Sequence, residues 1–189
     1  MATSVFDQIR LNKSDSEKSY RWFQTQIRNL GSRASAQDLM KESNNLKNNI
    51  IPGEMYLFFY DPKHKETLPY YDKFPLVLPF NTVKNGFYGI NLHYLPYLMR
   101  FRLLQALTDL ATNDKNNSTT RIRISWRILT TFSKIAPVQN AVKHYLSNHV
   151  QTRFLKINYP DWVTASQLPI ENFVGAKKEA VWNITSKGN

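Results

Sequence analysis

Cysteine is absent from this chain of 189 residues. Its absence excludes disulfide bonds and thiolate metal sites, and it fits a reducing compartment or a virus particle. Long apolar runs are missing as well, because no stretch approaches the roughly 18 residues that a membrane-spanning helix needs. The N-terminal residues contain no apolar segment typical of a signal peptide. We therefore expect a protein without a membrane partner.

Recognisable catalytic and cofactor motifs are also lacking. The sequence has no Walker loop, no GxGxxG and no nucleophile elbow. Its four histidines form no HExxH pair, which argues against a metal site. Asp61 and Asp72 are candidates for acid–base work, but Asp61 also fits a turn and Asp72 a loop ion pair. We expect no enzymatic activity, no catalytic residue, no metal, no cofactor and no small-molecule substrate.

Acidic residues are too few to balance the basic ones, and the net charge is +11. Residues 91–158 carry ten Lys and Arg against two Asp and Glu, whereas residues 51–90 carry four against four. Positive charge concentrated in one segment favours a polyanion as the binding partner, either nucleic acid or an acidic protein face. The alternative is that the charge serves solubility alone.

The pattern along the chain predicts an α+β fold, with a small, mainly antiparallel sheet and several packed helices. We expect residues 1–15 to form an N-terminal arm and residues 16–189 a single α+β domain that begins with helices. Strands are predicted at residues 54–60, 74–80 and 87–94, with a hairpin turn at Asn85-Gly86. The second strand should lie at an edge, because Pro75 and Pro79 cannot donate to a ladder. Gly89 indicates a bulge or a close backbone approach.

Further helices are expected at residues 16–30 and 35–48, after Leu95-Pro96, at residues 137–150 and at residues 170–182. The segment RIRISWRIL alternates like a strand, and we interpret it as a short strand that runs into a helix. His93 is expected to be a packed, hydrogen-bonded histidine. The predicted core is Phe59, Leu76, Leu78, Leu92, Leu95, Leu103 and Leu107.

The basic residues of the central segment are the candidate binding site. They would contact phosphates or an acidic partner without reading bases, and they are Arg121, Arg123, Arg127, Arg100, Arg102, Lys143, Arg153 and Lys156. Exposed tyrosines at positions 70, 71 and 88 could stack on bases or on a frayed end. The plainer interpretations are a solvated basic face and packed tyrosines. Aromatic residues and arginine are also enriched in protein interfaces, so a subunit docked in a larger particle remains open.

Two aromatic runs carry a resemblance to a known family. IIPGEMYLFFYDPKHKETLPYYDKFPLVLPF and GFYGINLHYLPYLMRFRLL, followed by KHYLSNHVQTRFLKINYPDW and LPIENF, resemble the DNA end protector family of T4-like tailed phages and cyanophages. The resemblance covers residues 18–182. It implies a non-enzymatic virion protein, present in the host cytoplasm during assembly, that binds packaged DNA ends and shields them from host exonuclease. The alternative is a structural subunit of the phage neck, tail or baseplate that docks to other virion proteins through its basic and aromatic surfaces.

Overall fold

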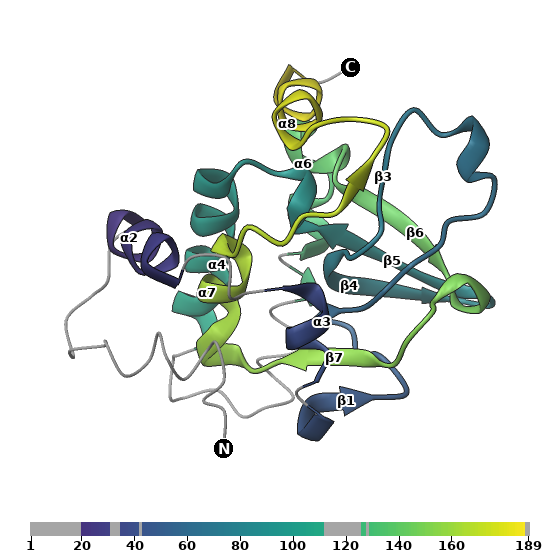
Figure 1. The fold of residues 1–189 in the computed structure, drawn as a ribbon, viewed down its shortest axis with the longest axis horizontal. Coiled ribbons are helices and arrows are strands. Elements are labelled where there is room, and N and C mark those ends of the chain that lie inside the picture. The colour runs from purple at the N-terminus through teal and green to yellow at the C-terminus, as the bar shows by residue number, and fades with distance from the viewer. Residues whose placement is uncertain (1–19, 31–34, 42, 112–125, 128, 188–189) are drawn as a thin grey trace.

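The computed structural model describes residues 20–30, 35–41, 43–111, 126–127 and 129–187. These residues form an antiparallel sheet with helices against it, which confirms the α+β class (Figure 1). The predicted arm, residues 1–15, lies outside the described residues, and the division into arm and single domain stays a prediction. The described helices are α2 (Tyr20–Leu30), α3 (Ala36–Leu39), α4 (Tyr97–Ala111), α6 (Ala136–Gln139), α7 (Trp162–Gln167) and α8 (Lys178–Lys187). None of them is long and apolar enough to cross a membrane.

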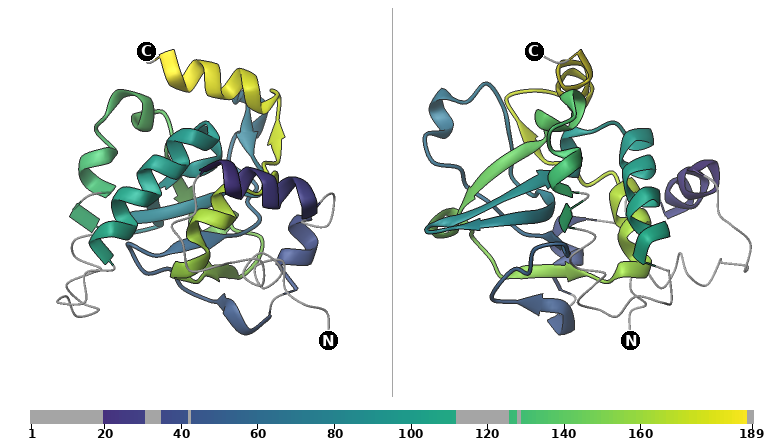
Figure 2. Two further views of the ribbon diagram at one scale, coloured as in Figure 1. Left: turned by 90° about the vertical axis from the view of Figure 1, so that its left-hand side faces the viewer. Right: turned by 180° about the vertical axis from the view of Figure 1, so that it is seen from behind.

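The main sheet has six strands in the order β1-β7-β2-β4-β5-β6, and every neighbouring pair is antiparallel. Its strands are β1 (Leu46–Lys47), β2 (Met55–Leu57), β4 (Leu76–Val83), β5 (Gly86–Asn91), β6 (Val142–Leu146) and β7 (Phe154–Ile157). A smaller two-stranded ribbon pairs β3 (Tyr71–Asp72) with β8 (Phe173–Val174). Helices α4 and α7 lie side by side against one face of the main sheet, and α2 lies outside them (Figures 1 and 2).

Each face of the sheet is covered by its own apolar cluster. Strand β2 explains why, since Met55 and Leu57 belong to the cluster under the helices whereas Tyr56 belongs to the opposite one. The opposite cluster is mostly aromatic and contains Tyr56, Phe58, Tyr60, Val77, Phe87, Tyr145 and Phe154. Side chains alternate between the faces of a strand, so a run of apolar residues needs cover on both sides. The predicted core is confirmed for its six leucines, while Phe59 is only partly buried.

Strand β4 lies inside the sheet, between β2 and β5, so its prediction as an edge strand is wrong. The register between β4 and β5 shifts between Pro79 and Asn81, opposite Gly89 and Tyr88. A bulge at this point tolerates a proline that cannot donate to the ladder. Gly89 lies opposite this bulge, and its close approach to the β4 backbone is confirmed, because an added Cβ would lie 3.2 Å from the carbonyl oxygen of Leu78 and 2.3 Å from Cγ1 of Val77.

Three predicted helices are shorter than expected or differ in kind. Residues 137–150 form only the last part of α6 before they become β6, which pairs with β5 from Gly86↔Leu146 to Ile90↔Val142. The predicted helix at residues 35–48 keeps four residues with Ser35 as N-cap, and the chain then enters β1. The predicted helix at residues 170–182 begins only at Lys178, because residues 173–174 pair with β3. In each case pairing with a distant strand outweighs the local periodicity.

Candidate nucleic-acid interface

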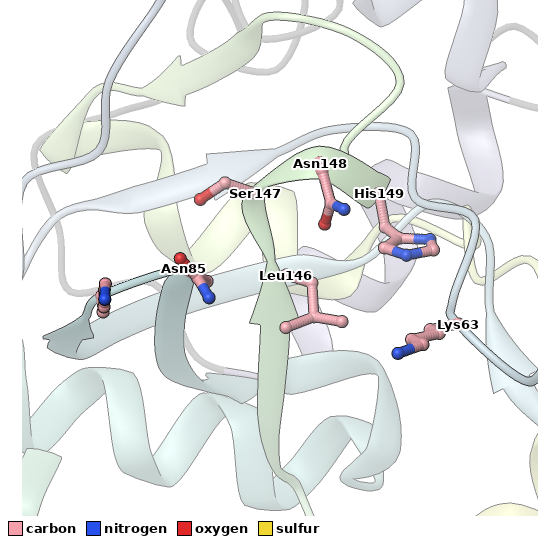
Figure 3. Close-up of a pocket in the computed structure, with 7 residues that line it drawn as sticks. Lys63, Asn85, Leu146, Ser147, Asn148 and His149 are labelled. Carbon is pink, nitrogen blue, oxygen red and sulfur yellow. The ribbon is translucent and has the colours of Figure 1, made fainter.

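An open hollow of about 530 Å³ lies at the end of the sheet where two chain reversals meet (Figure 3). The turn between β4 and β5 forms one side of it, and the turn after β6 forms another. Its lining is polar and basic, and consists of Lys63, Lys84, Asn85, Leu146, Ser147, Asn148 and His149. Such a mixture of ammonium groups, amides and hydroxyls is suited to contact with phosphate oxygens.

Backbone contacts hold these turns together. The amide of Ser147 donates to the carbonyl of Asn85 at 2.9 Å. Gly86 follows in the tight turn, and an added Cβ there would lie 1.9 Å from the carbonyl oxygen of Tyr145. The loop that carries Lys63 is tied to the same place, because the amide of Asp61 donates to the carbonyl of His149 at 3.1 Å. The lysines therefore extend from an anchored frame.

A second hollow of about 450 Å³ adjoins the first and shares Lys84 and Ser147 with it. Amide and hydroxyl side chains contribute much of its lining, namely Asn48, Asn49, Thr82, Ser147 and Thr152. No carboxylate side chain of the described residues lines either hollow. The two hollows together give an end of the sheet that offers donors and positive charge without an acidic group to repel a polyanion.

The nearby carboxylates are already occupied by other lysines. Asp61 lies 2.8 Å from the ammonium of Lys65, and Glu54 lies 2.6 Å from that of Lys156. Within the described residues, neither Lys63 nor Lys84 has a carboxylate oxygen within 4.0 Å. Their charges are therefore uncompensated and available to a partner.

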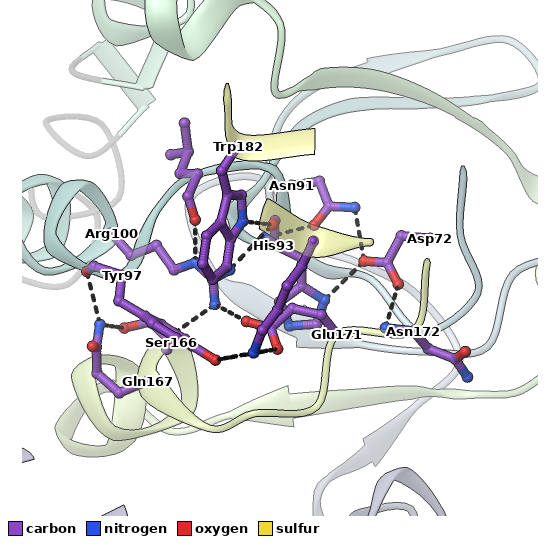
Figure 4. Close-up of polar contacts among 12 residues, drawn as sticks. Asp72, Asn91, His93, Tyr97, Arg100, Ser166, Gln167, Glu171, Asn172 and Trp182 are labelled. Atoms are coloured by element: carbon purple, nitrogen blue, oxygen red, sulfur yellow. Dashed lines mark hydrogen bonds and ion pairs between the residues drawn. The ribbon is translucent and has the colours of Figure 1, made fainter. Parts of the chain in front are cut away.

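Arg100 does not belong to this surface, and its prediction as a phosphate contact is corrected here. The side chain is fully buried and forms an ion pair with Glu171 at 2.8 Å (Figure 4). Its guanidinium also donates to three backbone carbonyls, those of His93, Leu95 and Ser166. Burial alone would raise the pKa of Glu171, but the positive charges around it, with Arg100 foremost, outweigh burial and lower that pKa. Arg100 is thus an internal cation that ties α4 to the segment after α7.

Two predicted lysines are only partly available. Lys156, on β7, is paired with Glu54. Lys143, on β6, is half-buried, and its ammonium lies 4.2 Å from the centre of the Tyr94 ring. Burial lowers the pKa of Lys143 to about 8.

The other predicted arginines are dispersed rather than gathered in one row. Arg102, Arg127 and Arg153 are exposed, on α4, on a helical turn and just before β7. Arg127 therefore does not lie on a strand, contrary to the alternating pattern. Arg121 and Arg123 lie outside the described residues, so their expected role stays a prediction.

A buried polar network lies under α8 and contains the histidine singled out from the sequence (Figure 4). His93 is fully buried, and its Nδ1 lies 2.8 Å from Oδ2 of Asp72. The Asp72 carboxylate also accepts from Asn91 and from the amides of Phe74 and Asn172. The expectation of a packed, hydrogen-bonded histidine is confirmed.

Asp61 and Asp72 do not form the acid–base pair considered from the sequence. Asp72 is enclosed in the buried network, whereas Asp61 forms its ion pair with Lys65 at the surface. The described residues contain no group of three or more His, Asp and Glu arranged to hold a metal ion.

Lys63 and Lys84 were missed in the sequence because they lie in a segment whose charges balance. The balance is misleading, because Glu54 and Asp61 pair with Lys156 and Lys65 and Asp72 is buried; of the four acids of the segment, Glu66 alone is exposed without an ion pair among the described residues. A signal was nevertheless present in the local pattern, because both lysines accompany turn residues, in DPKHK and in VKNG. Charged side chains at chain reversals project into solvent and are free to meet a ligand.

The comparison with known families is specific. A family described as phage T4 terminal DNA protecting protein matches residues 4–185. No curated protein and no solved structure matches the chain. Because the match covers nearly the whole chain, the protein belongs to the phage T4 terminal DNA protecting protein family.

Proposed function

We propose that this protein binds the ends of linear phage DNA without regard to sequence and shields them from exonuclease within the virion. The membership in a terminal DNA protecting family over residues 4–185 is the observation that carries this proposal. A net charge of +11 supports DNA as the partner. The protein acts as a cover for the end and not as an enzyme.

Lys63 and Lys84 are proposed as the central phosphate contacts. Both line the hollow at the end of the sheet, and the described structure gives neither of them an acidic partner. Lysine is a point charge that neutralises phosphate without a fixed hydrogen-bond fork, so these contacts carry no sequence information. Arg102, Arg127 and Arg153 are exposed and add to the positive charge that attracts DNA, while Arg121 and Arg123 are kept as proposed contacts.

The test compares linear DNA with closed-circular DNA of equal length in a salt series and in an exonuclease digestion. We expect tighter binding to the linear form and slower digestion of it. Each neutralised phosphate contributes roughly −0.9 to the slope of log affinity against log salt. The double variant Lys63→Gln/Lys84→Gln should therefore reduce the magnitude of that slope by about 2.

Lys187→Gln is the matched control, because Lys187 is an exposed lysine at the end of α8 and lines neither hollow. It should leave the slope within a few tenths of the unaltered protein. Equal binding to linear and circular DNA, with no protection from digestion, would contradict end binding. No binding to either at low salt would instead favour a structural subunit that docks to other virion proteins.

A further inference from the structure

A third pocket, of about 280 Å³, adjoins the lysine-lined hollow and differs from it in chemistry. Lys63 and Leu146 line both, so the two spaces are neighbours at the end of β6. The pocket lies between the aromatic face of the sheet and the loop at residues 61–72. Its lining is dominated by tyrosines, namely Tyr60, Tyr70, Tyr71, Tyr94 and Tyr145.

These tyrosines offer two kinds of surface. Tyr94 and Tyr145 are buried and form the inner part of the pocket. Tyr70 and Tyr71 are half-buried, and the ring of Tyr70 lies 6.0 Å from that of Tyr94. Aromatic rings that keep part of their face open accept a flat ligand by stacking.

Lys143, which lies over the Tyr94 ring, is a cation of this pocket in addition to Lys63, and the described residues give it no acidic partner. Among the described residues no carboxylate oxygen lies within 4.0 Å of its ammonium. The only carboxylate that lines the pocket, Asp72, is engaged by four other hydrogen bonds. A half-buried positive charge that the protein itself does not neutralise is suited to an anionic ligand.

A nucleotide satisfies both features, because it joins a flat base to a phosphate. We infer that this pocket receives an unpaired nucleotide at the tip of the DNA end, with its phosphate on Lys143 and its base against Tyr70 or Tyr71. The following phosphates of the same strand then lie along the adjoining hollow with Lys63 and Lys84. This inference rests on the proposed binding of DNA ends. It adds a pocket for an unpaired terminal nucleotide, which an end can offer and a continuous duplex cannot.

The pocket also explains why an end is preferred over the middle of a duplex. A base inside a duplex is stacked on both faces, and removing it costs a few kcal/mol, whereas a terminal base is released at much smaller cost. Phosphates alone cannot make this distinction, since both kinds of DNA present them equally. The tyrosine pocket therefore provides end selectivity, and the open hollow provides affinity.

The experiment uses DNA hairpins that have one end. A blunt hairpin, hairpins with a short unpaired 5′ or 3′ tail, and a closed dumbbell without an end are compared as ligands of the full chain. A 2-aminopurine at the tip of the tail reports stacking by a change in fluorescence. At least one tailed hairpin should bind about tenfold or more tighter than the dumbbell, since stacking of one base and a charge-assisted contact to its phosphate each contribute on that scale.

Lys143→Met removes the charge while it keeps the length and apolar surface of the side chain. It should reduce the preference for a tail over the dumbbell to about twofold or less. The double variant Tyr70→Leu/Tyr71→Leu removes both stacking surfaces and should abolish the 2-aminopurine signal, which gives a second test that does not depend on Lys143. Lys187→Met, the matched control, should keep both the preference and the signal.

The outcomes separate this inference from the proposed function. If tailed hairpins are preferred and protected from exonuclease but both pocket variants retain the preference and the signal, the pocket is not the site, although end binding stands. If the unaltered protein binds tailed hairpins and the dumbbell equally, the pocket inference is overturned together with end binding. Loss of the preference in both variants, with melting temperatures no more than a few degrees below that of the unaltered protein, supports the inference.

Discussion

Lys143 should lower the stability of the folded protein, and its replacement by methionine should show this. The pKa falls from its ordinary value of 10.5 to about 8 because the ammonium is buried. One pKa unit corresponds to about 1.4 kcal/mol, so the difference amounts to roughly 3 kcal/mol at neutral pH. The contact with the Tyr94 ring offsets about 1–2 kcal/mol of this. We therefore expect Lys143→Met to raise the free energy of unfolding by roughly 1–2 kcal/mol at pH 7.

The pH dependence has a definite sign. Between pH 8 and pH 10.5 the unfolded chain holds a proton on Lys143 that the folded chain has released. The stability of the unaltered protein therefore rises through this window, relative to a variant without the lysine. Burial also raises the pKa of the neighbouring Tyr60, Tyr94 and Tyr145 above the ordinary value of 10.0.

Urea denaturation of both proteins at pH 7 and at pH 10 measures this difference. The advantage of Lys143→Met should be largest at pH 7 and should shrink to about 0.8 kcal/mol at pH 10, where most unfolded chains still hold the proton. Groups common to both proteins cancel in the comparison. An advantage that is the same at both values of pH would refute the assignment of the effect to the lysine charge. So would a variant that is less stable at pH 7 by more than about 1 kcal/mol.

Two further substitutions test the packing on which the site depends. Arg100→Met should lower the free energy of unfolding by about 3–5 kcal/mol, because it leaves the buried carboxylate of Glu171 without its main cation. Arg102 is a nearby exposed arginine, and Arg102→Met should change the free energy of unfolding by no more than about 0.5 kcal/mol. Equal effects of the two substitutions in urea denaturation would contradict the burial of Arg100. Gly89→Ala should destabilise by about 1–3 kcal/mol through its clash with Val77. Adding Val77→Ala to Gly89→Ala should restore part of the lost stability, measured as an increase in melting temperature. If the two substitutions instead lower the melting temperature by the sum of their separate effects, the clash is contradicted.

Much of the sheet could be predicted because its signals are local. Asn85-Gly86 indicates a hairpin by its own turn chemistry, and the structure has β4 end at Val83 and β5 begin at Gly86. The apolar residues on both faces of β2 predict cover on both sides, which the two clusters provide. These predictions need no knowledge of distant residues.

The errors in the fold arise where distant pairing decides. Val138, Ala141, Val142 and Tyr145 are spaced as suits a helix, yet Val142 and Tyr145 lie in a strand because β5 offers a free edge there. Pro79 was placed at an edge because a bulge, which removes the need for its missing donor, depends on the partner strand. Neither feature is present in the segment itself.

The site was predicted less well, since a count of charges does not tell which charges are already paired. Arg100 contributed to the positive total of its segment but is neutralised inside the core by Glu171. Lys63 and Lys84 were hidden in the charge count by acids such as Glu54, which pairs with Lys156, and Asp72, which is buried. The class of partner could be inferred from the net charge, whereas the location of the contacts required the pairings.

The position of β7 has a consequence for how the chain folds. Residues 154–157 insert between residues 46–47 and residues 55–57, so a strand made late completes the part of the sheet formed by strands made early. Until it arrives, β2 has an open edge, and Tyr56 and Phe58 lack the Phe154 ring that contacts both. Contacts between residues so far apart in sequence form slowly. The nascent chain therefore keeps an aromatic, aggregation-prone edge exposed until most of it has left the ribosome, and its folding yield depends on how long that interval lasts.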